Sequence, residues 1–159
     1  MVRIASEGET VTPLPESTGT PPEELFRRSL RLLLEKDIDG WVGLWAEDGV
    51  MEFPFAPAGW PGRLDGRAAV AAYMADYPDH IDLHDFPELR IHRTTDPGTV
   101  VAEMRGAGTL VAGGDPFDMG YIAVVTVRDG LFTSYRDYWN PLAVPQSLAQ
   151  SVPDAGGAR

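Results

Sequence analysis

Residues 120–140 read GYIAVVTVRDGLFTSYRDYWN and carry the clearest structural signal in the chain. Two runs rich in β-branched and aromatic residues, 120–127 and 131–139, flank the dipeptide Asp129-Gly130. An Asp-Gly pair between two such runs is typical of a two-residue β-hairpin turn, because both residues tolerate positive φ. The stretch therefore predicts an antiparallel hairpin.

A two-residue turn also predicts the register of this hairpin. Arg128 would pair with Leu131, and Ile122 with Asp137. Both faces of the hairpin are then largely apolar, so both need cover. Helices can cover one face, and we expect the other to pack on a second copy of the chain, giving a homodimer through the outer sheet face. The first face would present Ile122, Val124, Thr126, Thr133, Tyr135, Asp137 and Trp139.

The region before the hairpin predicts three helices and several further strands. Thr20, Pro21 and Glu23 form a Thr-x-x-Glu capping box that would begin the first helix. Two more helices would follow, with a strand at residues 50–55 between them, and strand patterns continue from residue 81. Three N-terminal helices and then a run of antiparallel strands indicate the α+β class.

Composition limits the domain organisation and the partners. The chain has 159 residues, 43 % of them hydrophobic, no cysteine and a formal net charge of −11. This charge opposes binding to nucleic acid, and no apolar run reaches the length of a membrane span. Without an export signal, the cytoplasm is the expected compartment. We expect one domain at residues 21–143, a disordered tail at 1–20 and a flexible tail at 144–159.

Asp137 is the strongest candidate for a catalytic group. In the predicted register its neighbours on the same face are Ile122, Tyr135 and Trp139. A carboxylate among apolar and aromatic groups loses hydration, so its pKa rises toward the range useful for proton transfer. The alternative is a structural Asp, bonded to a backbone amide or to an arginine such as Arg105.

His84 is the second catalytic candidate, because a histidine can relay or donate a proton near neutral pH. The alternative is a histidine on the solvent side of a strand. His80, Asp82, His84 and Asp85 could also suggest a metal site. Asp85 would lie on the opposite strand face from the other three, however, and no second ligand cluster follows, so we expect no metal.

Other polar and aromatic residues could form the binding site. Glu103 and Arg105 share one strand face and could polarise a substrate oxygen, although a solvated ion pair is the alternative. No glycine-rich phosphate loop precedes a helix, and we expect no cofactor. The aromatic candidates for substrate contact are Trp41, Phe53, Tyr135 and Trp139.

Three motifs, 37–41 (DIDGW), 45–50 (WAEDGV) and 64–67 (LDGR), read with the predicted order of elements, resemble the nuclear transport factor 2-like superfamily, in particular its SnoaL-like branch. The resemblance covers about residues 21–143. It implies a curved antiparallel sheet wrapped around three N-terminal helices, forming a cone with a deep apolar pocket, in a protein that is usually dimeric.

Within this branch, the sequence is similar to the phenazine-biosynthesis A/B proteins. The similar positions are Tyr77-Pro78-Asp79, His84, Glu103 and the motif RDYWNP at 136–141. In that family the acidic residue of the last motif donates or accepts the proton, which implies this role for Asp137. The family has Glu at this position, one methylene longer than Asp, so reach and substrate can differ.

Limonene-epoxide-hydrolase-like enzymes also place a catalytic Asp in an Arg-Asp-Tyr context, which again points to Asp137. Their partner Arg and second Asp would fall near Met104 and Gly106, so the full triad is absent.

These observations lead to one main hypothesis and two alternatives. The main hypothesis is a cofactor-independent biosynthetic enzyme in which Asp137 and His84 perform general acid/base catalysis. It would cyclise, condense or isomerise an apolar, carbonyl-bearing, aromatic or polyketide-like small molecule. The first alternative is an epoxide hydrolase or epoxide-opening cyclase, in which Asp137 acts with an unrecognised partner such as Glu103 and Arg105. The second is a non-catalytic ligand-binding or dimerisation domain.

Overall fold

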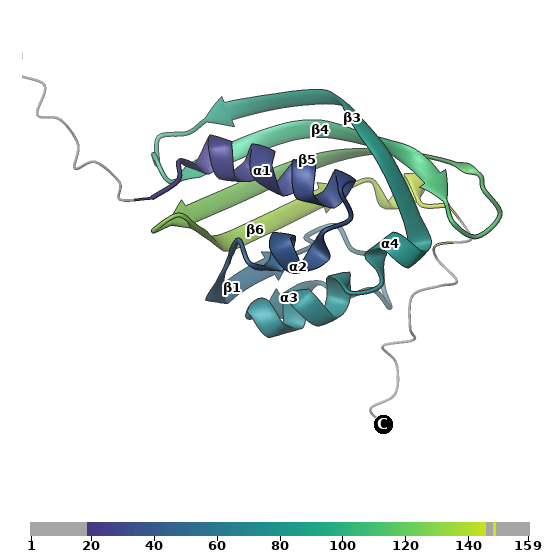
Figure 1. Ribbon diagram of the computed structural model, residues 1–159, viewed down its shortest axis with the longest axis horizontal. Helices are drawn as coiled ribbons and strands as arrows, with labels where there is room; N and C mark the ends of the chain where they lie inside the picture. Colours follow the sequence, from purple (N-terminus) through teal and green to yellow (C-terminus); the bar gives the residue numbers. More distant parts are fainter. Residues whose placement is uncertain (1–18, 146–147, 149–159) are drawn as a thin grey trace, which may run out of the picture.

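The computed structural model describes residues 19–145 and residue 148, which form a curved sheet with helices on its concave side (Figure 1). The predicted α+β class is confirmed. The elements are α1 (Pro22–Leu34), α2 (Ile38–Val42), β1 (Trp45–Glu52), β2 (Arg63–Asp65), α3 (Arg67–Met74), α4 (Tyr77–His80), β3 (Ile81–Arg93), β4 (Thr99–Leu110), β5 (Pro116–Arg128), β6 (Leu131–Trp139) and the 3-10 turn η1 (Pro141–Ala143). The six strands form one sheet in the order β2-β1-β6-β5-β4-β3.

The β5–β6 hairpin forms at the predicted turn, but its register changes after two residue pairs. Asp129 and Gly130 have φ values of 52° and 76°, as a two-residue turn with two positive φ angles requires. A bulge follows between Thr126 and Val127, so that Ala123, rather than the predicted Ile122, pairs with Asp137. The predicted composition of the two faces is therefore wrong, because one extra residue in β6 shifts every later pair.

Two boundaries also differ from the prediction. The capping box does not form: α1 has Pro21 as its N-cap residue without a side-chain hydrogen bond, and the Glu23 carboxylate lies 3.3 Å from Arg27 instead. The strand expected at residues 50–55 begins at Trp45, where the backbone pairs in parallel with Phe132 of β6. The helices also include one more than predicted, the single turn α4.

β3 and β4 form the long curved part of the sheet. Their pairing has two irregularities between Leu83 and Glu88, which bend β3. Gly108 of β4 lies close to the backbone of β3, because a Cβ at this position would collide with the carbonyl oxygen of Asp82.

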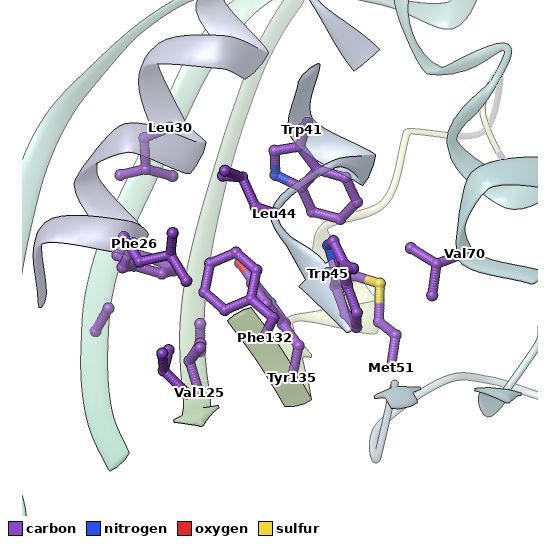
Figure 2. Packing of buried hydrophobic residues seen from close by; sticks show 14 of the residues in the cluster. Phe26, Leu30, Trp41, Leu44, Trp45, Met51, Val70, Val125, Phe132 and Tyr135 are labelled. Atoms are coloured by element: carbon purple, nitrogen blue, oxygen red, sulfur yellow. The ribbon is translucent and has the colours of Figure 1, made fainter. Parts of the chain in front are cut away.

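Aromatic side chains fill the core between the helices and β6 (Figure 2). The Trp45 ring stacks on Tyr135 with centroids 5.9 Å apart and meets the edge of Phe132 at 5.7 Å. Phe26 of α1 and Trp41 of α2 pack on the same group from the helix side. Truncating one such buried ring to Ala typically costs about 3–5 kcal/mol, so this group holds β6 firmly in place. A second buried cluster contains Leu83, Leu110, Phe117 and Met119.

The outer face of the sheet, turned away from the helices, mixes apolar and charged side chains. Ile122 is 44 % exposed and pairs with Tyr138 on β6 and Glu103 on β4. Arg136 is exposed on the same face. The face is less apolar than the predicted register implied, and the homodimer through it stays a prediction.

Candidate functional site

A cavity of about 330 Å³ lies between the helices and the inner face of the sheet. Its walls come from both buried clusters, and most of them are apolar or aromatic. The structure brings Asp137 together here with the four aromatic residues expected to contact substrate, Trp41, Phe53, Tyr135 and Trp139. The other described lining residues are Leu30, Leu33, Met51, Trp60, Ala72, Tyr73, Met74, Asp76, Tyr77, His80, Ile81, Leu83, Phe86, Met104, Phe117, Met119, Tyr121, Val144 and Leu148.

Asp137 enters the cavity from β6. Alternation along the strand places it on the inner face with Tyr135 and Trp139, while Arg136 points to the outer face. The residue keeps part of its surface open, but its Oδ1 atom is fully buried and has no hydrogen-bond partner. Burial raises the pKa of Asp137 to about 7. The carboxyl group can therefore take up and release a proton near neutral pH.

Four tyrosines from four elements surround Asp137. Burial, together with the charge of Asp137, raises the pKa of Tyr73 to about 12. Burial is also the main cause that raises the pKa values of Tyr77, Tyr121 and Tyr135, and the Asp137 charge contributes in each case. All four hydroxyls therefore keep their protons near neutral pH, so each can donate a hydrogen bond to a ligand oxygen.

The histidine that lines the cavity is His80, not His84. The His80 Nε2 atom lies 3.1 Å from Oδ2 of Asp76, which also lines the cavity. His84 follows the inward-facing Leu83 on β3, so alternation turns it outward. Its side chain is 54 % exposed and its Nε2 lies 3.0 Å from Oδ2 of Asp82. The structure does not bring His84 to the cavity, and this placement corrects the predicted relay to Asp137.

Glu103 and Arg105 also lie outside the cavity. Glu103 is on the outer face, where its Oε2 lies 2.7 Å from Nε2 of His92. Arg105 forms ion pairs with Asp118 at 2.9 Å and Glu88 at 3.5 Å. The structure therefore does not bring the two residues to this cavity, and their predicted role there is corrected to surface contacts with other polar side chains. The predicted alternative of an Arg105–Asp137 pair does not form either.

The wall of the cavity extends past the predicted domain end. Val144 and Leu148 line it and pack against the second buried cluster, although both follow residue 143. The domain boundaries stay predictions, and residues 1–18, 146–147 and 149–159 of the two predicted tails lie outside the described residues.

The described residues contain neither a metal-binding cluster nor a membrane-spanning helix. Within residues 19–145 and 148, no three His, Cys, Asp or Glu side chains are arranged to hold a metal ion. No helix in the same part of the chain is long and apolar enough to cross a membrane.

The sequence interpretation missed several polar groups of the cavity. Tyr73 and Tyr77 are four residues apart, a spacing that places two side chains on one side of a helical segment. Tyr121 precedes Ala123 by two residues and so shares its inner face. The buried Nε1 of Trp41 has no hydrogen-bond partner, and no sequence pattern indicates this. The helical spacing of Tyr73 and Tyr77 could have been read from the sequence. The inward position of Tyr121 becomes clear only with the correct register of the hairpin.

Known proteins share this architecture. An uncharacterized PhzA/B-like protein of Pseudomonas aeruginosa is 39 % identical over 126 residues, which cover 79 % of this chain and 89 % of that protein. The crystal structure of a candidate isomerase from Bacillus subtilis is 41 % identical, covers 80 % of this chain and 92 % of its own, and has a TM-score of 0.76.

A third comparison supports the fold alone. The crystal structure of a candidate polyketide cyclase from Pseudomonas putida KT2440 has a TM-score of 0.68 at 17 % identity, covering 85 % of this chain and 100 % of its own. Solved neighbours also include proteins described as nuclear transport factor 2-like and ketosteroid isomerase-like in fold. Residues 26–135 match the SnoaL-like domain family. The chain therefore belongs to the SnoaL-like family.

Proposed function

We propose that the protein is a cofactor-independent enzyme in which Asp137 is the general acid/base for a small, apolar, carbonyl-bearing substrate. One observation carries the proposal: a buried carboxyl oxygen without a hydrogen-bond partner, in an apolar cavity, on a residue whose pKa is about 7. Structural carboxyl groups in protein interiors are normally hydrogen-bonded, so a cavity-lining carboxyl group with a buried, unpartnered oxygen fits a group that acts on a ligand.

The proposed reaction begins with transfer of a proton from the carbon next to a substrate carbonyl to the Asp137 carboxylate. The electron pair of the broken C–H bond then forms an enolate, whose charge develops on the carbonyl oxygen. A tyrosine hydroxyl such as that of Tyr135 or Tyr121 can donate a hydrogen bond to this oxygen, which stabilises the charge in a site of low dielectric.

The enolate can then follow two routes, and Asp137 completes either one. In an isomerisation, the protonated carboxyl returns its proton to a different carbon. In a cyclisation or condensation, the enolate carbon attacks a second carbonyl carbon, and Asp137 protonates the new alkoxide oxygen. Each route regenerates the carboxylate, so no cofactor is consumed. Holding the reacting atoms in place within the cavity supplies part of the rate enhancement.

The relatives support the kind of reaction rather than the substrate. A candidate isomerase at 41 % identity and a candidate polyketide cyclase with the same fold fit general acid/base chemistry on carbonyl compounds. The epoxide-opening alternative named Glu103 and Arg105 as examples of a partner for Asp137, and both residues lie outside the cavity. Neither residue therefore acts with Asp137 in this cavity.

Proton exchange gives a test that does not require the natural substrate. The α-protons of 2-tetralone exchange with D₂O through its enol, and ¹H NMR follows their loss. We expect the wild-type protein to accelerate this exchange, and Asp137→Asn to lower the acceleration by about 10²–10⁴-fold because the amide cannot take up the proton. Glu103→Gln, on the outer face, is the matched control and should exchange at the wild-type rate. Equal acceleration by wild type and Asp137→Asn would contradict the proposal.

A further inference from the structure

The ionisable groups of the cavity carry no net positive charge. Among the described lining residues there are two carboxyl groups, Asp137 and Asp76, and one histidine, His80, but no lysine or arginine. His80 and Asp76 lie 3.1 Å apart. The one histidine therefore has a carboxyl group as its neighbour, and no second histidine is present among the described lining residues. No net cation is therefore available to a ligand from these groups.

Two arginines of the sheet, Arg136 and Arg105, lie outside the cavity. Arg136 precedes Asp137, but strand alternation places it exposed on the outer face. Arg105 is held by Asp118 and Glu88. Successive side chains of a strand point to opposite faces of the sheet, so Asp137 faces the apolar interior while Arg136 faces outward.

The remaining polar groups of the cavity suit uncharged oxygen atoms. The hydroxyls of Tyr73, Tyr77, Tyr121 and Tyr135 can each donate one hydrogen bond and accept others. The Asp137 carboxyl can accept a hydrogen bond from a phenol or enol, or donate one to a ketone when it is protonated. A ligand carboxylate would instead bring a second negative charge next to Asp137 in an apolar cavity, where repulsion between like charges is strong.

We propose that this cavity selects uncharged aromatic ketones, phenols or enols and rejects aromatic carboxylates of the same size. The inference deepens the proposed function, since it rests on the same cavity as the substrate site. It assigns the selection to the Asp137 carboxylate, with no lysine or arginine among the described lining residues to offset its charge.

Isothermal titration calorimetry at pH 8 tests this selection with three ligands of one shape. These are 2-naphthol, 2-acetylnaphthalene and 2-naphthoate, each titrated into the full-length protein. We expect 2-naphthoate to bind at least about tenfold more weakly than the two uncharged compounds. Binding of 2-naphthoate as tight as that of 2-naphthol would overturn the inference, and so would failure of all three ligands to bind.

Two variants show whether Asp137 causes the selection. Asp137→Asn keeps the shape of the side chain and removes its charge, so 2-naphthoate binding should strengthen toward that of 2-acetylnaphthalene. Asp118→Asn, which removes a carboxylate from the surface, should leave the preference of the wild type unchanged. A preference that is the same in wild type and Asp137→Asn would overturn the assignment to Asp137.

A pH series with the wild type gives an independent readout. As Asp137 takes up a proton below pH 7, 2-naphthoate should bind more tightly, while 2-acetylnaphthalene should change little. A constant affinity for 2-naphthoate between pH 8 and pH 5.5 would contradict the inference. Selective binding without proton exchange on 2-tetralone would contradict the catalytic proposal alone, so the two failures are distinguishable. The other titratable groups of the cavity are Tyr73, Tyr77, Tyr121, Tyr135, Asp76 and His80.

Discussion

Two aspartates in this protein have opposite surroundings, and the contrast explains why only one is suited to catalysis. Asp96, in the turn between β3 and β4, lies 2.8 Å from Nη2 of Arg128 and accepts hydrogen bonds from Gly98 and Thr99. The Arg128 hydrogen bond, followed by those of Gly98 and Thr99, lowers the pKa of Asp96 to about 2. Asp137 has a buried oxygen without a partner, and burial raises its pKa to about 7.

This comparison shows that an aspartate can stabilise the fold, as Asp96 does, or be suited to proton transfer, as Asp137 is. A carboxylate with several donors is committed to its ionised form and to its neighbours. A desolvated carboxyl without donors can change its protonation state near neutral pH, which general acid/base catalysis requires.

The largest expected effect is on the pH profile of proton exchange. Abstraction of an α-proton needs the ionised form of Asp137, so the wild-type rate should rise about a hundredfold between pH 5 and pH 8 and level off above pH 7. Exchange of the 2-tetralone α-protons, corrected for the protein-free rate, measures this profile. Asp96→Asn should keep the profile. A rate that is already constant above pH 5 would show that no group with a pKa near 7 acts as the base.

The next effect is on the free energy of unfolding, which the Asp→Asn substitutions at positions 137 and 96 should change in opposite directions. The pKa of Asp137 in the folded state exceeds its ordinary value of 3.8, so folding binds a proton and the wild type loses stability as pH rises from about 4 to 7. At pH 8, Asp137→Asn should therefore be more stable than wild type, by at most about 4 kcal/mol. The gain should vanish near pH 4. Urea denaturation at both pH values measures it.

Asp96→Asn should instead lower the free energy of unfolding at pH 8. The lowered pKa of Asp96 means that its contribution is present above pH 4 and is lost as the pH falls toward 2. A destabilised Asp137→Asn at pH 8 would show that the carboxylate is paired in solution, as Asp96 is.

A smaller effect is expected on ligand affinity when two leucines near the C-terminal end of the described chain are substituted. Leu148 lines the cavity, whereas Leu142 is 94 % exposed. Leu148→Ser should weaken 2-acetylnaphthalene binding about tenfold, because part of the apolar wall is replaced by a polar group. Leu142→Ser should leave the affinity unchanged. Calorimetry compares the two, and equal affinities would remove Leu148 from the binding site.

The smallest expected effect concerns His84. It pairs with Asp82 at the surface, so His84→Gln should change the proton-exchange rate by less than about twofold. A tenfold loss in the same NMR assay would restore the role that the sequence suggested.

Much of the architecture was predictable from short-range chemistry. Asp129-Gly130 specifies its own turn, because few other residue pairs accept two positive φ values. The inward position of Asp137 also follows from sequence, since it alternates with Tyr135 and Trp139 on one strand. The motifs at 37–41, 45–50 and 64–67, read with the predicted order of elements, indicated the SnoaL-like family, and the family match over residues 26–135 confirms it.

The predictions of hairpin register and site residues were wrong where contacts between distant parts of the chain decide the structure. The bulge near Thr126 changes the partners of every later residue in the hairpin, and no residue type announces it. His84, Glu103 and Arg105 were chosen by chemical type, but the structure places their side chains outside the cavity, where each contacts other charged groups at the surface. Asp76 and His80 lie at the two ends of the short helix α4, and its packing brings both to the cavity. Leu148 lines the cavity although it follows the predicted domain end.

The central claim is that Asp137 is a desolvated carboxyl without a structural partner. Carbon-detected NMR of the side-chain carboxyl, with Asp137→Asn to assign its signal, measures the pKa directly. The account predicts a midpoint near pH 7, far above the usual value of 3.8. A midpoint at or below 3.8 would mean that Asp137 is paired or solvated like the surface aspartates, and would contradict its proposed role as the general acid/base.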